Sequence, residues 1–519
     1  MALLTNLIAR CTLPAMVLLA LAGVIVYYSG VIVYRLYFHP LAKFPGPKLA
    51  AASWWYETYH ELIKNGGSQF TPHIRDLHAR YGPIVRITPD ELSIADAEFH
   101  DRLYAPQPAV RDRHPSFSAA LGTLNGCFST NDHYLHRQRR AAVNAFYSPA
   151  NLAAFEPLAQ QRVDHLCNLL WEHRGQVTPL RTYCAALSFD SFYSWAFGNP
   201  LRLLDDLDKA EMINKTVEKL VTSPPVYKCF PSAMRAAKLI PSWILVKLSR
   251  DVANAFELQA MVAREAERFV ASAEDATDVE KRGHSVGAET LFSVIGKSRI
   301  PGEEKTASRI TQEGTEMLMA SFTPGRSMMN GVYFLGAFPD VLTKLQAELA
   351  EAFSDPKVAM DFKTLSQLPY LNAVVKETLR AGFPISSRLP MIAHETMQFQ
   401  EWEIPAYTAM SVNHRGLLFD ETVFPDPHAF KPERWLDTEH PIDAKRYFVP
   451  FGKGSRGCPG REFATHLIRL MLARFAQRFV FELADTDWDR DVKVVRESLL
   501  TASAHGSTGV KVVLLDERN

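Results

Sequence analysis

The hydrophobic pattern begins with one long apolar segment near the N-terminus. No charged residue lies between Arg10 and Arg35. As an α-helix, residues 11–34 would reach about 36 Å, which is enough to cross a bilayer. Tyr34 stands at the far end of this run, where aromatic side chains favour the membrane interface. The pattern therefore predicts one transmembrane helix at about 11–34.

A cleaved signal peptide is the alternative interpretation, because Ala20-Leu21-Ala22 has the form of an A-x-A cleavage site. The apolar run continues well beyond this triplet, whereas the apolar region of a signal peptide is typically about 7–15 residues long. We therefore favour an uncleaved anchor. Arg35, Lys43 and Lys48 follow the span and Arg10 precedes it. This excess of positive charge predicts that the body of the protein lies in the cytosol.

Beyond the anchor, the apolar spacing is mainly that of helices. Pro45 and Pro47 bracket Gly46 and stiffen the link to the body. The elements expected from the pattern are a hairpin at 84–96, helices within 130–275, 303–355 and 364–381, a polar loop at 275–287 and a small β region at 388–413. No repeat and no alternating βαβ pattern occurs. We divide the chain into an anchor, 1–38, and a body, 39–519, and expect a mainly α fold with minor β.

Composition narrows the function without naming it. The 519 residues are 47% hydrophobic, which allows a core large enough to enclose a bulky cofactor. Lys plus Arg balance Asp plus Glu at 57 each, so no nucleic-acid partner is expected. The six cysteines are scattered, with no CxxC pair. This spacing argues against a disulfide scaffold and against a cysteine-rich zinc site.

The segment FGKGSRGCPG, residues 451–460, carries the strongest chemical signal. Its glycines let the loop wrap closely around a flat ligand. A helical run follows, and its positive end would stabilise a thiolate at Cys458. The same segment also fits GxGxxG, the dinucleotide fingerprint, but that motif needs a βαβ unit and an acid about 20 residues further on. Residues 470–480 contain no acid, so we reject this alternative.

The spacing F-x-x-G-x-R-x-C-x-G resembles the haem-binding motif of cytochromes P450, and the resemblance covers the chain after about residue 38. HPLAKFPGPKLAA and LHARYGPIVRITPDELSIAD are similar to filamentous-fungal members of secondary metabolism, including the trichodiene oxygenase type. The resemblance implies the P450 fold and makes Cys458 the axial ligand of haem b, with Phe451 in the cofactor-binding loop. Thiolate ligation favours cleavage of the O–O bond.

The resemblance also implies which residues hold the haem propionates. His136-x-x-x-Arg140 is similar to the family's WxxxR helix, with His in place of Trp. We expect His136, Arg140, Arg388 and Arg456 to bind the propionates, which favour guanidinium and imidazole N–H groups. Arg137 and Arg139 are expected on a solvated basic face that could dock an acidic reductase. The alternative for Arg140 is that it belongs to the same solvated basic face as Arg137 and Arg139.

A second set of residues resembles the family's buried charge network. Glu377 and Arg380 are spaced i, i+3 on a predicted helix and share one face. An ExxR pair alone has no weight, since Glu265 and Arg268 form another. The order is informative, because Arg434 and then the cysteine loop follow Glu377 and Arg380. We expect a structural network beneath the haem.

The oxygen-handling helix departs from the family's A/G-G-x-D/E-T-T pattern. Residues 320–324 read ASFTP, so Thr323 remains while Phe322 replaces the acid and Pro324 the second threonine. Pro324 has no N–H, and we expect an opened turn at the carbonyl of Ala320. Proton delivery would then depend on Thr323 and water. Alternatively, the Thr323 hydroxyl only bonds its own backbone.

The expected activity is hydroxylation or epoxidation of an apolar small molecule, such as a terpenoid or other fungal secondary metabolite. Electrons would come from NADPH through a separate FAD/FMN reductase, and the anchor would hold the enzyme in the endoplasmic reticulum membrane. Phe322 and Met319 are expected in the substrate pocket, with segments 107–130, 317–323 and 383–388. Two alternatives stay open: a haem-thiolate isomerase, dehydratase or peroxygenase that needs no reductase, and a non-catalytic membrane haem-binding protein.

Overall fold

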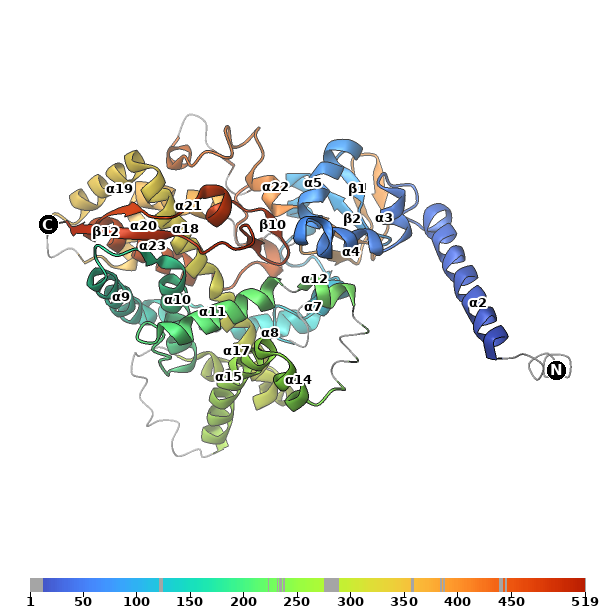
Figure 1. The fold of residues 1–519 in the computed structure, drawn as a ribbon, viewed down its shortest axis with the longest axis horizontal. Coiled ribbons are helices and arrows are strands. Elements are labelled where there is room, and N and C mark those ends of the chain that lie inside the picture. The colour runs from blue at the N-terminus through green and yellow to red at the C-terminus, as the bar shows by residue number, and fades with distance from the viewer. Residues whose placement is uncertain are drawn as a thin grey trace.

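The computed structural model of the chain is mainly helical, and a single N-terminal helix projects from its body (Figure 1). The structure describes residues 13–120, 125–222, 224–230, 232, 236, 239–274, 289–355, 359–382, 385, 388–437, 442–443 and 446–518. The predicted polar loop at 275–287 and most of the pocket segment 383–388 lie outside the described residues.

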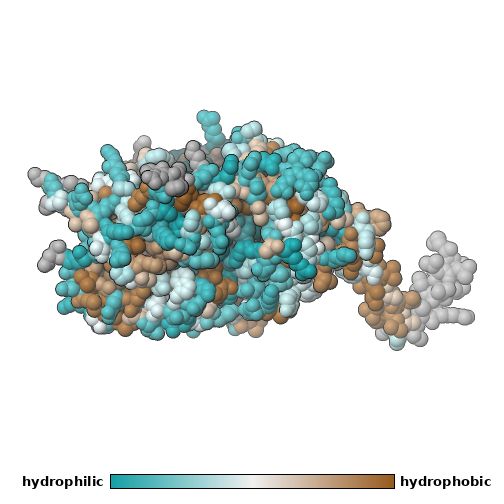
Figure 2. All heavy atoms as spheres, turned by 90° about the horizontal axis from the view of Figure 1, so that it is seen from above, coloured by the Kyte–Doolittle hydropathy of each residue, from teal (hydrophilic) through white to brown (hydrophobic). Residues whose placement is uncertain are grey.

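The projecting helix is α2 (Leu13–Val33), which continues into the π-helical turn η1 (Tyr34–Phe38). Residues Pro14–Phe38 are long and apolar enough to cross a membrane by length and composition, and none of that window is buried. Figure 2 shows apolar side chains along this helix. The predicted span is therefore confirmed as a helix, and it extends four residues beyond the predicted end.

Helices of the N-terminal half pack on one another and against a small sheet (Figure 1). They are α3 (Lys48–Ala52), α4 (Trp55–Leu62), α5 (Phe70–Tyr81), α6 (Ala97–Leu103), α7 (Pro115–Ala120), α8 (His133–Phe146), α9 (Pro149–Glu172), α10 (Leu180–Phe197), α11 (Leu207–Thr222), α12 (Pro224–Cys229), α14 (Ser242–Leu248) and α15 (Arg250–Glu274), with the short turn η2 (Lys64–Gly66).

The C-terminal half completes the helical body. Its helices are α16 (Leu291–Lys297), α17 (Ala307–Ala320), α18 (Phe322–Ala337), α19 (Pro339–Ala352), α20 (Phe362–Gln367), α21 (Pro369–Ala381), α22 (His414–Leu418) and α23 (Arg461–Arg478), with the short turns η3 (Gly302–Lys305), η4 (Pro432–Trp435), η5 (Gly454–Arg456) and η6 (Trp488–Val492). The helical regions predicted from the sequence are confirmed.

The strands form small sheets at the edges of the helical body. The larger sheet has the order β1-β2-β8-β5-β3, and it joins β1 (Ile84–Arg86), β2 (Glu91–Ile94), β3 (Arg111–Arg113), β5 (Met391–Ala393) and β8 (Ala409–Val412). β1 and β2 form the predicted hairpin, with Ile84 opposite Ile94. The other strands are β6 (Met397–Phe399) with β7 (Trp402–Ile404), β10 (Arg496–Glu497) with β11 (Thr501–Ala502), and β4 (Thr178–Pro179) and β9 (Phe479–Leu483) on either side of β12 (Lys511–Glu517).

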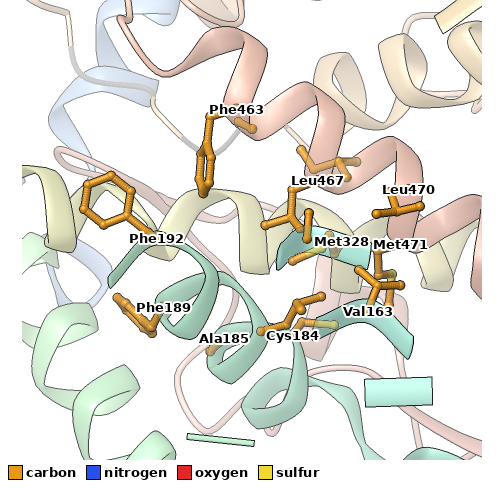
Figure 3. Packing of buried hydrophobic residues seen from close by; sticks show 14 of the residues in the cluster. Val163, Cys184, Ala185, Phe189, Phe192, Met328, Phe463, Leu467, Leu470 and Met471 are labelled. Carbon is orange, nitrogen blue, oxygen red and sulfur yellow. The ribbon is translucent and has the colours of Figure 1, made fainter. Parts of the chain in front are cut away.

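The main core lies where α9, α10, α18 and α23 meet. Figure 3 shows Met328 of α18 among side chains of the other helices, including Val163, Cys184 and Leu467. Close approach depends on glycine: a Cβ on Gly325 would lie 2.9 Å from the backbone oxygen of Cys184. The central helix is therefore held against two neighbours, which fixes the frame on which the site is built.

Candidate active site

The cysteine loop is a tight turn held by its own backbone. The Cys458 N–H donates to the Phe451 carbonyl at 2.8 Å, and the Gly457 N–H donates to the Gly454 carbonyl at 3.1 Å. Gly454 has a positive φ of 66°, and a Cβ there would collide with the backbone of Tyr104. Only glycine fits that position. Helix α23 begins three residues after Cys458, so the sulfur lies near the positive end of a helix.

Different groups around the Cys458 thiol shift its pKa in opposite directions. Burial raises its pKa, because a thiolate loses hydration in the interior. A hydrogen bond from the backbone of Gly460 and the charges of Arg140 and Arg461 lower it. These groups favour a metal-bound thiolate at this position.

A cluster of buried positive charge lies beside the loop, and one of its members was not foreseen. Arg456 donates to the Asn131 carbonyl at 2.7 Å, and Arg113 of β3 donates to the Phe128 carbonyl. Both Nε–H groups are buried and have no hydrogen-bond partner among the described residues. Arg113 stands in the three-residue strand β3, and the motifs used in the sequence analysis did not point to it.

The pKa values of this cluster show that its charges crowd one another. Burial and the nearby charge of Arg113 lower the pKa of Arg456 to about 9. Burial lowers the pKa of His136 to about 2, with the charges of Arg456, Arg113 and Arg140 acting in the same direction. Arg140 itself donates to Asn144 at 2.6 Å. Such crowding of cations is relieved by an anionic ligand.

The structure brings together the predicted network of Glu377, Arg380 and Arg434. Arg380 donates through Nη2 and Nε to the Glu377 carboxylate at 2.7 and 2.9 Å, and neither side chain is exposed. Arg434 Nε donates to the same carboxylate at 3.1 Å, and so does Trp435 Nε1 at 2.9 Å. Arg380 also donates to the carbonyl of Pro427 at 2.8 Å. Every charge in this network has a partner, so it joins α21 firmly to the segment before the cysteine loop.

The central helix is broken at Ser321, between α17 and α18, as the sequence predicted. Pro324 has no N–H that could donate to the carbonyl of Ala320. This carbonyl accepts a hydrogen bond from the Thr323 hydroxyl at 3.0 Å instead. The carbonyl of Ser321 accepts one from Ser188 of α10 at 2.5 Å. The opened turn is thus stabilised by hydroxyl groups. In this structure the Thr323 hydroxyl bonds its own backbone, which was the alternative considered for it.

The side chains near the break face two directions. Ala320 is exposed, and Thr323 and Met319 are half-buried, although most of the helix is buried. Phe322 is buried and lies on another face, where it lines an opening of about 430 Å³ together with Ala185 and Asn214. Phe322 and Met319 stay predictions for the substrate pocket.

Comparison with known proteins decides the family. The family model described as Cytochrome P450 matches residues 47–504. The chain belongs to the cytochrome P450 family. This P450 is 34% identical over 511 residues to cytochrome P450 monooxygenase MO6277 of Ascocoryne sarcoides, covering 96% of this chain and 99% of the relative. It is 36% identical over 484 residues to cytochrome P450 monooxygenase tpcC of Cochliobolus heterostrophus, covering 91% and 90%. It is 32% identical over 486 residues to tryptophan 6-hydroxylase fscE of Fusarium equiseti, covering 91% and 92%.

This P450 is a haem-dependent monooxygenase, as its family and its similarity to fungal enzymes of secondary metabolism show. The residues around the cysteine loop fit the haem that the family implies. A sulfur near the N-terminus of a helix can ligate iron, and the Nε–H groups of Arg113 and Arg456, which have no partner in the part of the chain that the structure describes, are suited to carboxylates. Bound haem supplies the binding and reduction of dioxygen.

One prediction for the basic residues of this P450 is wrong, and another stays a prediction. Arg388 was expected on a propionate; its Nη2 and Nε donate to Glu57 at 2.6 Å and to Glu91 at 2.7 Å, so two buried carboxylates hold it, and its role toward haem stays a prediction. Arg139 was expected in solvent, but it is buried and donates to Glu304 and to Thr130. Arg137 is exposed, as expected. The sequence motifs locate these arginines in the chain. They do not predict which carboxylate each side chain binds.

Proposed function

We propose that Cys458 is the axial ligand of the haem iron and that His136, Arg140 and Arg456 bind the propionates. Arg113 joins them in place of Arg388. The support is the buried positive cluster beside the cysteine loop, together with the Nε–H groups of Arg113 and Arg456, for which the described part of the chain holds no acceptor. Phe451, whose carbonyl accepts the Cys458 N–H, holds the loop in shape. Glu377, Arg380 and Arg434 lock the scaffold beneath it.

The substrate that fits this site is an apolar small molecule, and the reaction is its hydroxylation or epoxidation. Met319 and Ala320 would contact the substrate from α17, and Phe322 would shape the wall behind them. A terpenoid or other fungal secondary metabolite is the class we favour. The support is the similarity to fungal enzymes that include conidiogenone synthase PchP450 of Penicillium rubens, which is 32% identical over 467 residues.

Electrons are proposed to come from NADPH through a separate FAD/FMN reductase, as P450 monooxygenases generally use a redox partner. Residues 1–38 would anchor the catalytic body, 39–519, to the endoplasmic reticulum with the body in the cytosol. The support is the exposed apolar helix together with Arg35, Lys43 and Lys48 after it. Turnover that needs both NADPH and reductase separates this proposal from a haem-thiolate isomerase or peroxygenase.

The observation that carries the haem assignment is the single cysteine in the tight loop, so Cys458 is the residue to change. We expect Cys458→Ala to lose the red-shifted carbon monoxide band of a thiolate-ligated ferrous haem, because no sulfur remains in reach of the iron. Cys229→Ala, at a half-buried cysteine of α12, is the matched control and should keep the band. A Cys458→Ala protein that keeps the band contradicts the assignment. Metabolite profiling after deletion of the gene then identifies the substrate.

Thr323 is proposed to take part in proton delivery on the oxygen side. We expect Thr323→Ala to divert reducing equivalents to peroxide, because the hydroxyl that bonds the freed carbonyl of Ala320 is lost. The measurement is the ratio of peroxide formed to NADPH oxidised. Thr311→Ala, which removes another hydroxyl bonded to its own helix at 2.6 Å, is the control. An unchanged ratio in Thr323→Ala removes Thr323 from the mechanism.

A further inference from the structure

An opening of about 430 Å³ lies beside the second half of the central helix, where α10, α11 and α18 meet the chain that precedes β12. Its lining combines apolar side chains, such as Phe322 and Met329 of α18, with the polar side chains of Arg326 on the same helix and Asn214 on α11. Binding sites for small molecules typically have this mixed character. The opening therefore suits a ligand that is partly apolar and partly polar.

The two carboxylates that line the opening already have cationic partners. Glu218 accepts a hydrogen bond from Arg181 Nη2. Asp491 accepts hydrogen bonds from Arg490 Nε at 2.9 Å and from the Ser507 hydroxyl at 3.0 Å. Each of these negative charges is thus paired with a guanidinium other than that of Arg326.

Arg326 is the cation of the opening that lacks such a pairing. Its Nη1 donates to the carbonyl of Thr501, and no carboxylate of the described residues is bonded to it. Burial lowers the pKa of Arg326 to about 10, against the opposing charge of Glu218 and together with the charges of Arg181 and Arg496. A partly buried guanidinium that is bonded only to a neutral carbonyl is stabilised by an anionic ligand.

Asn214 gives a second and independent indication of a ligand. Its side chain is only 2% exposed, and its Nδ2 is buried without a hydrogen-bond partner in the part of the chain that the structure describes. A buried amide N–H that lacks an acceptor costs about 1–3 kcal/mol. An acceptor atom that enters the opening beside Asn214 would remove this cost.

A carboxylate matches these two donors better than a phosphate does. It is planar and has two oxygens, one for the guanidinium of Arg326 and one for the amide N–H of Asn214. A phosphate monoester has three acceptor oxygens and a charge of about −1.5 to −2, which one unpaired guanidinium does not offset. Phe322 and Met329 would contact the apolar part of the same molecule.

We propose that this opening binds the carboxylate of an otherwise apolar organic acid, with Arg326 and Asn214 as the two donors. Such an acid has two possible sources: the substrate itself, held by its carboxylate, or a separate acid that binds beside the substrate. The site does not depend on the haem assignment. If Arg326 instead serves only to fix the strand β11 through Thr501, the opening has no preference for an anion.

The first test compares 4-bromobenzoate with 4-bromobenzamide, which have nearly the same shape and differ in charge. Titration calorimetry on the purified full chain should show that the acid binds at least about tenfold more tightly than the amide. Arg326→Gln should remove this preference. Arg137→Gln, which deletes an exposed arginine of α8, is the charge-matched control and should keep it. Equal affinities in the wild type, or a preference that survives in Arg326→Gln, overturn the proposal.

Asn214→Asp tests the site without removing the bond between Arg326 and Thr501. It keeps the shape of the side chain and adds a negative charge to the opening, so the preference for the acid should again be lost. Inorganic phosphate should not displace 4-bromobenzoate at equal concentration. A preference that Asn214→Asp retains contradicts the site, and displacement by phosphate contradicts the choice of a carboxylate.

The anomalous signal of bromine locates the bound 4-bromobenzoate in crystals of the full chain. We expect the bromine beside Phe322 and Met329, with the carboxylate turned toward Arg326. A bromine signal found only elsewhere in the molecule overturns the proposal, whatever the calorimetry shows.

A last test, on the haem-loaded chain, separates the two sources of the acid. The probes are ω-imidazolyl alkanoates of increasing length and the matching alcohols, whose imidazole shifts the haem absorption when it ligates iron. If an acid binds more tightly than its alcohol in the wild type but not in Arg326→Gln, one molecule spans both places and the carboxylate belongs to the substrate. If acids and alcohols bind equally while 4-bromobenzoate still binds, the ligand is a separate acid. A wild type that shows no haem absorption contradicts the proposed function instead, and the calorimetry stands by itself.

Discussion

Arg113 and Arg388 are both buried, but their side chains have different hydrogen-bond partners. Arg388 is held between Glu57 and Glu91, whereas the buried Nε–H of Arg113 has no partner within the described ranges. The sequence motif pointed to Arg388, because it follows the ExxR helix. Short strands such as β3 carry no such signal, and the ladder that pairs Arg113 with Met391 is a long-range contact. Which buried arginine stands beside the cysteine loop was therefore beyond sequence reasoning.

The two arginines should respond differently to the same change. We expect Arg113→Leu to fold and to release haem about tenfold faster, since a charge-assisted hydrogen bond contributes about 1.5–3 kcal/mol. Transfer of haem to an acceptor apoprotein measures the rate. Arg388→Leu should instead lower the thermal midpoint strongly, because unpaired buried carboxylates cost about 3–5 kcal/mol. Equal haem release in Arg113→Leu and the wild type contradicts the assignment of Arg113.

Glu61 of α4 gives the protein a dependence of stability on pH. Burial, together with the charge of Glu57, raises its pKa from 4.5 to about 8. Below about pH 4.5 both folded and unfolded chains hold the proton. Between pH 4.5 and 8 the unfolded chain releases it first, so stability falls as pH rises, and above pH 8 the loss is complete.

Glu61→Gln removes this loss. We expect the variant to gain about 2–4 kcal/mol over the wild type between pH 5 and 8, and thermal unfolding at several pH values measures the gain. Glu98→Gln, at an exposed glutamate of α6, should run parallel to the wild type. A gain that does not depend on pH would show that Glu61 is not the titrating group.

At the scale of elements, the sequence predicted the break between α17 and α18. It did not predict which groups bond the carbonyls that the break leaves free. Pro324 lacks an N–H, which is a local property, so the sequence predicted an opened turn at Ala320. The groups that satisfy the freed carbonyls come partly from another helix, because Ser188 lies 133 residues from Ser321 in the chain. Local chemistry therefore gave the position of the break, and tertiary packing completed it.

Ser188 should be important for keeping this turn open. Ser188→Ala leaves the buried carbonyl of Ser321 without its hydroxyl donor, and we expect a loss of about 1–3 kcal/mol in the free energy of unfolding. Ser191→Ala is a close control, since Ser191 is also fully buried on α10 and its hydroxyl has no partner among the described residues. Equal losses in both variants would show that the contact with Ser321 contributes nothing.

For the whole molecule, the sequence predicted a helical body, a separate anchor and a cysteine loop near the C-terminus, because these depend on periodicity and on one dense motif. The sequence did not predict the contacts that join the anchor to the body. Arg86 Nη1 donates to the carbonyl of Arg35 at 2.8 Å, and Arg35 Nη1 donates to the carbonyl of Ala52 at 2.9 Å. The turn η1 is therefore bonded to the body, and the predicted boundary at residue 38 falls inside the joint.

Two deletions test this boundary. Removal of residues 1–33 should abolish flotation with membranes and leave the thermal midpoint unchanged. Removal of residues 1–38 should also abolish flotation but lower the midpoint, because the buried Arg86 loses an acceptor. Equal midpoints would show that the joint contributes no stability. Continued flotation of either variant would show that membrane contact lies elsewhere.

The break at Ser321 separates the central helix into α17 and α18, and the sequences of these two helices can change independently. α18 is fixed by Met328, Gly325 and their neighbours in the main core. α17 ends at the turn, and its residues Ile310, Met317 and Leu318 pack in the same core, so the turn changes the helix direction while both helices stay packed. Substitutions at the exposed end of α17, where Ala320 lies, can change that surface while the scaffold stays intact. A break of this kind in the central helix offers a simple physical route by which one ancestral enzyme diversifies into many specificities.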